Sequence, residues 1–160
     1  MIADADSHPS PLIRRARPED ASLIAALVDE AYAPYISRIG RKPGPMLDDY
    51  AQVIATSTVY VSTDDAGITG VLVMQPEGAD LLLVNVAVAA RSRGQGVGKR
   101  LMTFCEGCAR ELGCQGVRLY THELMSENLT IYRTLGYLET HRATQDGFAR
   151  VFMRKPLGTA

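Results

Sequence analysis

The 160-residue sequence contains no tryptophan, and aromatic residues make up only 6% of it. So few aromatic side chains argue against the stacking platforms on which proteins bind single-stranded nucleic acid. An excess of charge is also missing, because 17 Lys and Arg residues stand against 18 Asp and Glu residues, a net charge of −1. The chain therefore has no electrostatic signal of a protein that binds nucleic acid or an acidic membrane, and we expect neither partner.

Cysteine is scarce as well, with Cys105, Cys108 and Cys114 as the only three in the chain. An odd, clustered set does not fit the disulfide framework of a secreted protein, so we expect a reduced, cytoplasmic protein. Cys105 and Cys108 form a C-x-x-C pair, but both fall on an apolar stripe with helical spacing, where free cysteine packs as a small hydrophobe. No His and Cys set completes a four-ligand zinc site, so no metal is expected.

Long hydrophobic runs are absent too. The most apolar stretch, residues 79–90, has about a dozen residues and contains Asn85, whereas a membrane-spanning helix needs about 20. This stretch predicts a buried strand instead. Residues 1–10 are acidic and polar and predict a disordered N-terminal tail, and the length of the remainder predicts a single domain over residues 11–157.

The rest of the chain alternates between short apolar strands and amphipathic helices. Predicted strands cover residues 12–16, 59–63, 68–75, 80–88, 116–121, 137–144 and 148–155. Predicted helices run from Pro18 to near Pro34 and over residues 47–56, 97–112 and 126–135, with a Gly- and Pro-rich loop over residues 35–46. This order predicts an α/β layer sandwich with a mixed sheet, in which residues 80–88 form a central strand covered on both faces.

The segment that indicates chemistry is RSRGQGVGKR, residues 91–100, between the apolar strand and an amphipathic helix. Its three alternating glycines allow a ligand to approach the backbone closely, and amides at a helix N-terminus attract anions. Four basic residues add local positive charge to a chain of balanced overall charge. The pattern predicts a pyrophosphate-binding loop, although a Gly-rich surface turn before a helix is the simpler alternative.

Two common phosphate-binding motifs do not fit this segment. Aligning a Walker A loop on Gly98 and Lys99 puts Arg93 in place of the first glycine and Arg100 in place of the Ser or Thr that binds magnesium. The dinucleotide fingerprint G-x-G-x-x-G fails because the third glycine arrives one residue early. A nucleotide-triphosphate module is therefore the weaker hypothesis.

The sequence R-G-Q-G-V-G over residues 93–98 matches the [QR]-x-x-G-x-[GA] signature of the GNAT superfamily of N-acetyltransferases. The V-A-V segment over residues 86–88 and the Y-R-T-L-G-Y segment over residues 132–137 also resemble that family. The resemblance implies a mixed, splayed central sheet of about seven strands flanked by about four helices. It further implies acetyl-CoA as co-substrate and acetyl transfer to a primary amine of a small molecule or peptide, by direct attack in a ternary complex. A non-catalytic acyl-CoA-binding sensor or interaction domain stays the alternative, and a homodimer is left open.

The resemblance also assigns residues. It places coenzyme binding at Val86, Ala87, Val88, Arg93, Gly94, Gln95, Gly96, Val97, Gly98, Lys99, Asn128 and Tyr132. Tyr132 matches the tyrosine that protonates the departing thiolate, and its ordinary pKa of about 10 keeps it protonated at neutral pH; a packing role is the alternative. Met125 occupies the position where many members have a coenzyme-contacting Asn, so we expect Asn128 or Ser126 to take that contact.

A proton acceptor is harder to find in the sequence. Family members that acetylate protein lysines often carry a Glu on the central strand, where this chain has Leu82. His122, at a strand end and with a suitable ordinary pKa, and Glu30 are the candidate bases, although either also fits a solvated surface.

By resemblance, the acceptor contacts the first helix and the following loop, which gives Tyr32, Tyr35 and Arg38 as candidate substrate-binding residues. Arginines among tyrosines suit an amine that carries a carboxylate, and Asp48 or Asp49 suits a second ammonium group. A Pro-rich loop with solvated charges fits the same residues.

Overall fold

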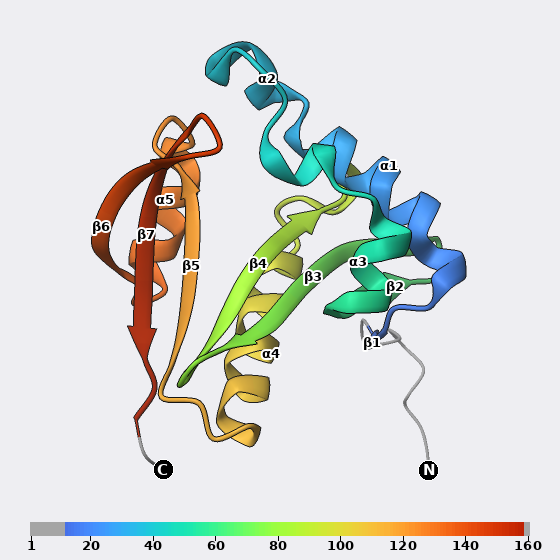
Figure 1. Ribbon diagram of the computed structural model, residues 1–160. Coiled ribbons are helices and arrows are strands. Elements are labelled where there is room, and N and C mark those ends of the chain that lie inside the picture. The colour runs from blue at the N-terminus through green and yellow to red at the C-terminus, as the bar shows by residue number, and fades with distance from the viewer. Residues whose placement is uncertain (1–11, 159–160) are drawn as a thin grey trace.

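A computed structural model describes residues 12–158, so the tail predicted over residues 1–10 lies outside the described residues (Figure 1). Seven strands form one mixed sheet in the order β1-β2-β3-β4-β5-β7-β6. They are β1 (Leu12–Arg15), β2 (Thr58–Asp64), β3 (Gly67–Glu77), β4 (Asp80–Val88), β5 (Gly116–His122), β6 (Leu138–Gln145) and β7 (Phe148–Pro156). Only the β4–β5 pair is parallel, and each of the seven predicted strands is confirmed.

Helices cover both faces of the sheet. They are α1 (Ala21–Tyr32), α2 (Pro34–Ile39), α3 (Tyr50–Thr56), α4 (Val97–Glu111) and α5 (Ser126–Thr134). The helices α1 and α3 lie on one face, over a core that includes Ile24 and Val61, and α4 and α5 lie on the other (Figure 1). Cys105 is buried in this second core beside Leu101, as its place on the apolar stripe predicted. The predicted α/β layer sandwich is confirmed.

The loop predicted over residues 35–46 is wrong in part, because it contains helix α2 and a 3-10 turn, η3 (Gly44–Leu47). Pro34 occupies the first helical position of α2, where a missing N–H costs nothing, and Gly40 ends the helix with a φ of 88°. The many prolines and glycines therefore mark the ends of a short helix as well as a loop. Residues 12–158 therefore contain five α-helices where about four were expected.

Two helix starts also differ from the prediction. The first helix was expected from Pro18, but a 3-10 turn, η2 (Pro18–Asp20), precedes α1. The second was expected from residue 47, but α3 begins at Tyr50, because the Asp49 carboxylate accepts hydrogen bonds from the backbone N–H groups of Ala51 and Gln52. A carboxylate in this position stabilises the first turn by satisfying orphan donors, and so sets the start of the helix.

The sheet opens between β4 and β5. These strands pair only from Asp80 to Leu83 on β4 and from Gly116 to Leu119 on β5, and both strands then continue without pairing to each other. In Figure 1 they diverge toward the end where α2 lies. The separation leaves one edge of β4 without a strand partner over residues 84–88. Two cavities lie along the diverging strands and together form a cleft.

An ion pair closes the other end of this cleft. Asp80, the first residue of β4, is 8% exposed, and Arg154 of β7 donates to both of its carboxylate oxygens at 2.9 Å. The hydrogen bonds from Arg154 hold the pKa of Asp80 below its ordinary range. The pair thus ties the two halves of the sheet together where they meet.

We expect Asp80→Asn to lower the free energy of unfolding by about 1.5–3 kcal/mol at pH 7, because it weakens two charge-assisted hydrogen bonds at a nearly buried carboxylate. Since the folded-state pKa is lowered, this contribution is fully present above the unfolded-chain pKa of about 3.9 and is lost as the pH falls below it. Urea unfolding of both proteins from pH 7 to pH 2 measures the difference. Asp64→Asn, which breaks an exposed pair with Arg91, is the control and stays close to wild type.

Candidate active site

The glycine-rich segment forms a turn directly before α4, so that its backbone N–H groups lie at the N-terminus of that helix. Gly94 and Gly96 have φ angles of +78° and +79°, a conformation that side-chain-bearing residues rarely adopt. Among the described residues, nothing accepts a hydrogen bond from the backbone N–H of Gly94, Gly96, Val97, Gly98 or Lys99. These donors gather at the positive end of a 15-residue helix, which is the arrangement that binds phosphate groups.

Two side-chain contacts stabilise the residues just before this turn. The Glu30 carboxylate accepts a hydrogen bond from the backbone N–H of Ala90 at 3.1 Å, and Arg91 donates to both carboxylate oxygens of Asp64 at 3.0 and 3.1 Å. Neither Glu30 nor Arg91 lines the two cavities of the cleft. The structure therefore places Glu30, a candidate base, away from the cavities and gives it a positioning role for the turn.

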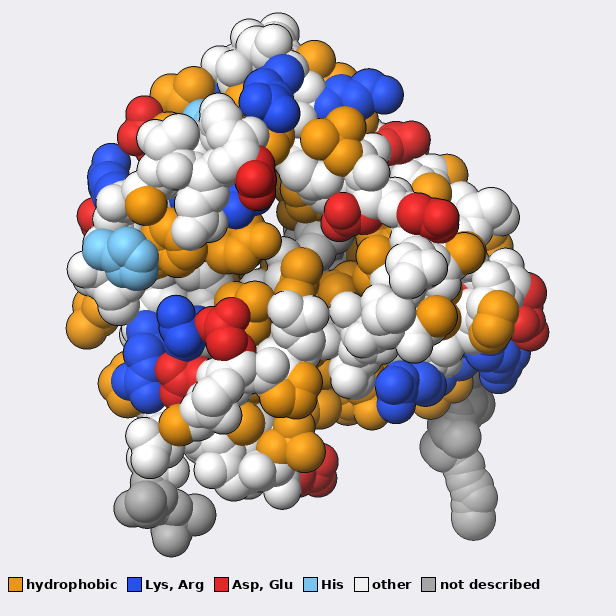
Figure 2. Space-filling model, in the orientation of Figure 1, with side chains coloured by type: hydrophobic (Ala, Val, Ile, Leu, Met, Phe, Trp, Pro, Cys, Tyr) orange, Lys and Arg blue, Asp and Glu red, His pale blue; other side chains and the backbone are white. Residues whose placement is uncertain are grey.

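A groove of about 740 Å³ runs from this turn along the open edge of β4, between α1 and α2 on one side and α4 and α5 on the other. Figure 2 shows the surface hollowed at the middle of the molecule, with hydrophobic side chains inside the hollow. Eight of the predicted coenzyme-binding residues line the groove: Val86, Ala87, Val88, Arg93, Gly98, Lys99, Asn128 and Tyr132. Gly94, Gln95 and Gly96 lie exposed in the turn, and the side chain of Val97 is buried in the core.

A second, smaller cavity of about 150 Å³ lies between residues 83–86 of β4 and residues 120–122 of β5. It is enclosed by η3 and the residue that follows it, Asp48, and by the ends of β5 and β7. Four residues line both the groove and this cavity: Tyr32, Val86, Asn128 and Tyr132. The two spaces therefore adjoin at these four residues, of which Tyr132 comes from α5.

The Tyr132 ring packs in the core, and its hydroxyl has no hydrogen-bond partner among the described residues. The residue is 9% exposed and packs edge-on against Tyr137, with ring centroids 6.1 Å apart. Its hydroxyl makes no hydrogen bond with any residue of the described chain. Burial raises the pKa of Tyr132 to about 12, so the phenol keeps its proton at neutral pH.

One wall of the smaller cavity is set by a chain of buried hydrogen bonds that sequence reasoning missed. The Tyr32 hydroxyl donates to Asn85 Oδ1 at 2.7 Å, Asn85 Nδ2 donates to the Tyr50 hydroxyl at 3.2 Å, and that hydroxyl donates to the Pro45 carbonyl at 2.7 Å. Asn85 is 4% exposed, and its side chain links α1, β4, α3 and η3. The signal in the sequence was a lone amide within an otherwise apolar strand, which needs partners when buried.

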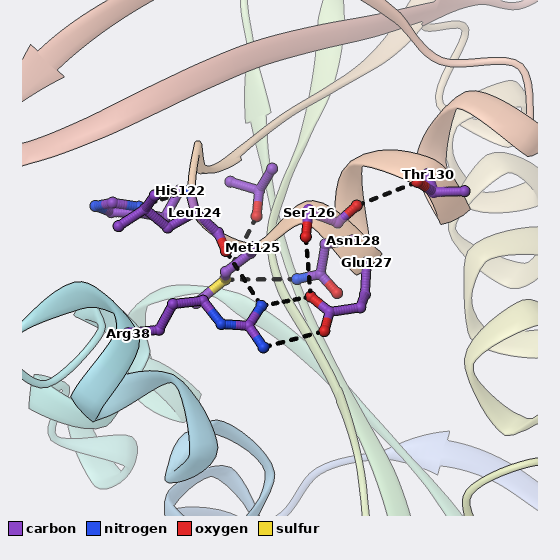
Figure 3. A network of polar contacts seen from close by, with 9 residues as sticks. Arg38, His122, Leu124, Met125, Ser126, Glu127, Asn128 and Thr130 are labelled. Atoms are coloured by element: carbon purple, nitrogen blue, oxygen red, sulfur yellow. Dashed lines mark hydrogen bonds and ion pairs between the residues drawn. The ribbon is translucent and has the colours of Figure 1, made fainter.

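The remaining candidate substrate residues lie elsewhere than expected. Tyr35 and Arg38 line the large groove and not the smaller cavity. Arg38 Nη1 and Nη2 donate to the two carboxylate oxygens of Glu127 at 2.6 and 3.1 Å, and Nη1 also donates to the Leu124 carbonyl (Figure 3). Hydrogen bonds from Arg38 lower the pKa of Glu127 to about 2. This exposed pair joins α2 to the start of α5, and both residues line the large groove.

His122, the other candidate base, does line the smaller cavity. Its Nδ1 accepts a hydrogen bond from the backbone N–H of Leu124 at 3.1 Å, so the neutral imidazole carries its proton on Nε2. Burial lowers the pKa of His122, and the nearby Arg150 lowers it further against an opposing effect of Glu123. This arrangement presents His122 as a neutral hydrogen-bond donor, because taking up a proton on Nδ1 would break the bond to Leu124.

Within residues 12–158, none of the helices is both long and apolar enough to cross a membrane. The same residues hold no group of three or more His, Cys, Asp or Glu side chains placed to bind a metal ion.

The comparison with family models identifies one family. The family model for the acetyltransferase (GNAT) domain matches residues 55–139, more than half of the chain. A comparison with curated proteins gives no significant match. The chain therefore belongs to the GNAT acetyltransferase family and is an acyltransferase, as the motif over residues 93–98 predicted.

Solved structures of low sequence identity share the fold. The PaiA N-acetyltransferase from Thermoplasma acidophilum, in complex with coenzyme A, is 17% identical with a TM-score of 0.77, and the match covers 93% of this chain and 100% of that one. The ribosomal-protein-S18-alanine N-acetyltransferase from Escherichia coli is 17% identical with a TM-score of 0.73, covering 94% and 96%. Nourseothricin acetyltransferase is 23% identical with a TM-score of 0.71, covering 92% and 99%.

Proposed function

We propose that this protein transfers the acetyl group of acetyl-CoA to a primary amine by direct attack in a ternary complex. The observation that supports this most is that a large groove and a small cavity adjoin at residues that include Tyr132. Such an arrangement allows donor and acceptor to be bound at once, on opposite sides of the reacting carbonyl. Holding both reactants in line makes the attack effectively unimolecular. The free cysteines of the described chain accord with a reducing, cytoplasmic location.

The donor fits the large groove. Its pyrophosphate would lie against the unpaired amides from Gly94 to Lys99, with Arg93 and Lys99 adding positive charge. The open edge of β4 offers backbone groups to an extended chain, in the manner of an added strand. The donor supplies an acyl group activated by its sulfur leaving group, and these residues hold and orient it.

Tyr132 serves as the general acid. As the amine nitrogen bonds to the carbonyl carbon and the carbon–sulfur bond breaks, the Tyr132 hydroxyl gives its proton to the departing sulfur. Its raised pKa keeps it in the protonated form that this step needs. No covalent enzyme intermediate is required, because Cys105 is buried with its pKa raised to about 12 and does not line either cavity.

The attacking amine must be neutral, so a group must take its proton. Glu30 is bound to Ala90, and Nδ1 of His122 is bound to the Leu124 N–H. Of the described residues that line the smaller cavity, Asp48 is the one with a carboxylate. Asp48 is exposed to solvent on one side, but its partial desolvation in the cavity raises its pKa, which favours proton uptake. We therefore assign Asp48 as the proton acceptor.

Release of free thiol in the presence of acetyl-CoA and a panel of amines tests this function. We expect amine-dependent thiol release, and product mass spectrometry should show one added acetyl group. Cys108 and Cys114 are partly exposed, so a reaction without amine provides the thiol background. If the protein binds coenzyme A but releases no thiol with any amine, the proposal is wrong and a non-catalytic acyl-CoA sensor takes its place.

A further inference from the structure

The smaller cavity has opposite charges on its two walls. Asp48 follows η3 on the side of the N-terminal helices, and Arg150 lies on β7, on the other side of the cleft. No ion pair joins Arg150 to a carboxylate within residues 12–158, nor does one join Asp48 to a cation there. Both line the cavity as charged side chains without a charged partner. Charges in a partly buried cavity favour a ligand that carries the complementary charges.

The positive wall has two donors at neighbouring places. His122 of β5 and Arg150 of β7 are directly paired across the two strands, so their side chains share one face of the sheet. The imidazole presents its Nε2–H, since Nδ1 accepts from Leu124, and Arg150 contributes a charged fork of donors. A guanidinium beside a neutral N–H donor suits a carboxylate, which accepts several hydrogen bonds at once.

Contacts with neutral side chains hold Arg150 at this wall, so its positive charge is not neutralised by a carboxylate. Its guanidinium carbon lies 4.3 Å from the centroid of the Tyr120 ring, and Nη1 donates to Gln145 Oε1 at 3.0 Å. Both partners are neutral. A Cβ built on Gly44 would lie 3.8 Å from Arg150 Nη2, so the guanidinium reaches across toward η3, the turn that precedes Asp48.

We propose that the acceptor is a small zwitterionic amine, such as a free amino acid, whose carboxylate binds Arg150 and His122 while its ammonium group faces Asp48. The inference rests on the proposed function and adds the class of acceptor. The cavity of about 150 Å³ has room for about six non-hydrogen atoms, which is enough for the amine, the carboxylate and a short connection between them. A longer side chain would extend from the cavity to solvent.

Three matched sets of amines test this inference: free amino acids, the corresponding amino acid amides, and the corresponding amines without the carboxylate. Wild-type protein should give a kcat/KM at least about tenfold higher for the amino acids, because only they satisfy Arg150. Arg150→Gln should lower kcat/KM for amino acids about tenfold to thirtyfold, mainly through KM, and change it less than about twofold for the amides. Arg150→Lys keeps the charge but not the planar guanidinium, so its kcat/KM for amino acids should lie between those of wild type and Arg150→Gln.

Arg110→Gln is the control, because Arg110 is exposed in the last turn of α4 and lines neither the cavity nor the large groove. It should leave the kcat/KM of all three sets unchanged. Thermal unfolding of each variant shows whether loss of the Tyr120 contact disturbs the fold. The inference is overturned if wild-type protein acetylates the amides or the decarboxylated amines as well as the amino acids, or if Arg150→Gln lowers all three sets equally.

A binding measurement separates this inference from the proposed function. Isothermal titration of the protein with an amino acid, in the presence of coenzyme A, needs no turnover. Binding that depends on Arg150 without any acetyl transfer would support the carboxylate-binding wall and overturn the catalytic proposal. Acetyl transfer to amines without any preference for a carboxylate would support the catalytic proposal and overturn the carboxylate-binding wall.

Discussion

Replacing Gly98 by Glu should weaken coenzyme binding by about 1,000-fold while leaving the protein folded. Gly98 lies in the first turn of α4 and lines the groove, beside the unpaired amides of the turn. A carboxylate there competes for those amides and repels phosphate groups. One like-charge contact at about 4 Å costs roughly 4 kcal/mol near a protein surface, which corresponds to about 1,000-fold in affinity. Isothermal titration with coenzyme A measures the loss.

The fold should tolerate this change. A Cβ on Gly98 would meet only the Val88 side chain, at an ordinary contact distance of 3.5 Å. Glu is also a better helix former than Gly, and a negative charge in the first turn is favourable, so the free energy of unfolding should not fall. Gly107→Glu is the matched control, because Gly107 lies on the same helix with open space around its Cβ and outside the groove. Unchanged coenzyme binding by Gly98→Glu would place the phosphate site elsewhere.

Replacing Tyr132 by Phe should lower kcat about 100-fold, the low end of the effect of general acid catalysis, and leave the affinity for coenzyme A within about twofold. The substitution removes one hydroxyl that has no partner among the described residues and keeps the ring packed against Tyr137. The loss should therefore fall on the step in which sulfur departs. Steady-state rates with a saturating amine, together with a coenzyme titration, separate the two quantities.

Tyr137→Phe is the control for this substitution. Tyr137 is buried in the same core, but its hydroxyl donates to Glu106 at 3.0 Å, away from both cavities. Its loss should lower the free energy of unfolding by about 1–3 kcal/mol, because a nearly buried carboxylate loses a partner, and kcat should not change. The Tyr132 pKa of about 12 also predicts no loss of activity from its ionisation up to about pH 10. An unaltered kcat in Tyr132→Phe would remove the acid role.

Local patterns in the sequence predicted the parts of the fold whose backbone they determine. The central strand β4 follows from an apolar run, β6 and β7 from the turn between them, and α4 from apolar residues at helical spacing. The helix α2 was missed because proline and glycine mark both loops and the ends of short helices, and Pro34 and Gly40 are such ends. The start of α3 was also missed, because the sequence alone does not show that Asp49 is the residue whose side chain caps the helix.

The candidate site, like the fold, has parts that the sequence predicted and parts that it did not. The turn over residues 93–98 was predictable, because glycines at positive φ and amides at a helix start are properties of one continuous segment. The direction of a side chain was not. Arg38 points to Glu127, 89 residues away, and Glu30 binds Ala90, because packing between distant segments decides which partner lies within reach.

By itself, therefore, the sequence determined the family, the order of elements and the glycine-rich turn before α4, since each depends on residues that are neighbours in the chain. Its balanced charge also indicated that any anionic ligand would have to be bound by local geometry and not by the overall field of the protein. Only the tertiary structure brought Asp48, His122 and Arg150 around one small cavity. Their meeting depends on how β4 separates from β5 and how β5 pairs with β7, which are long-range contacts that no local pattern encodes.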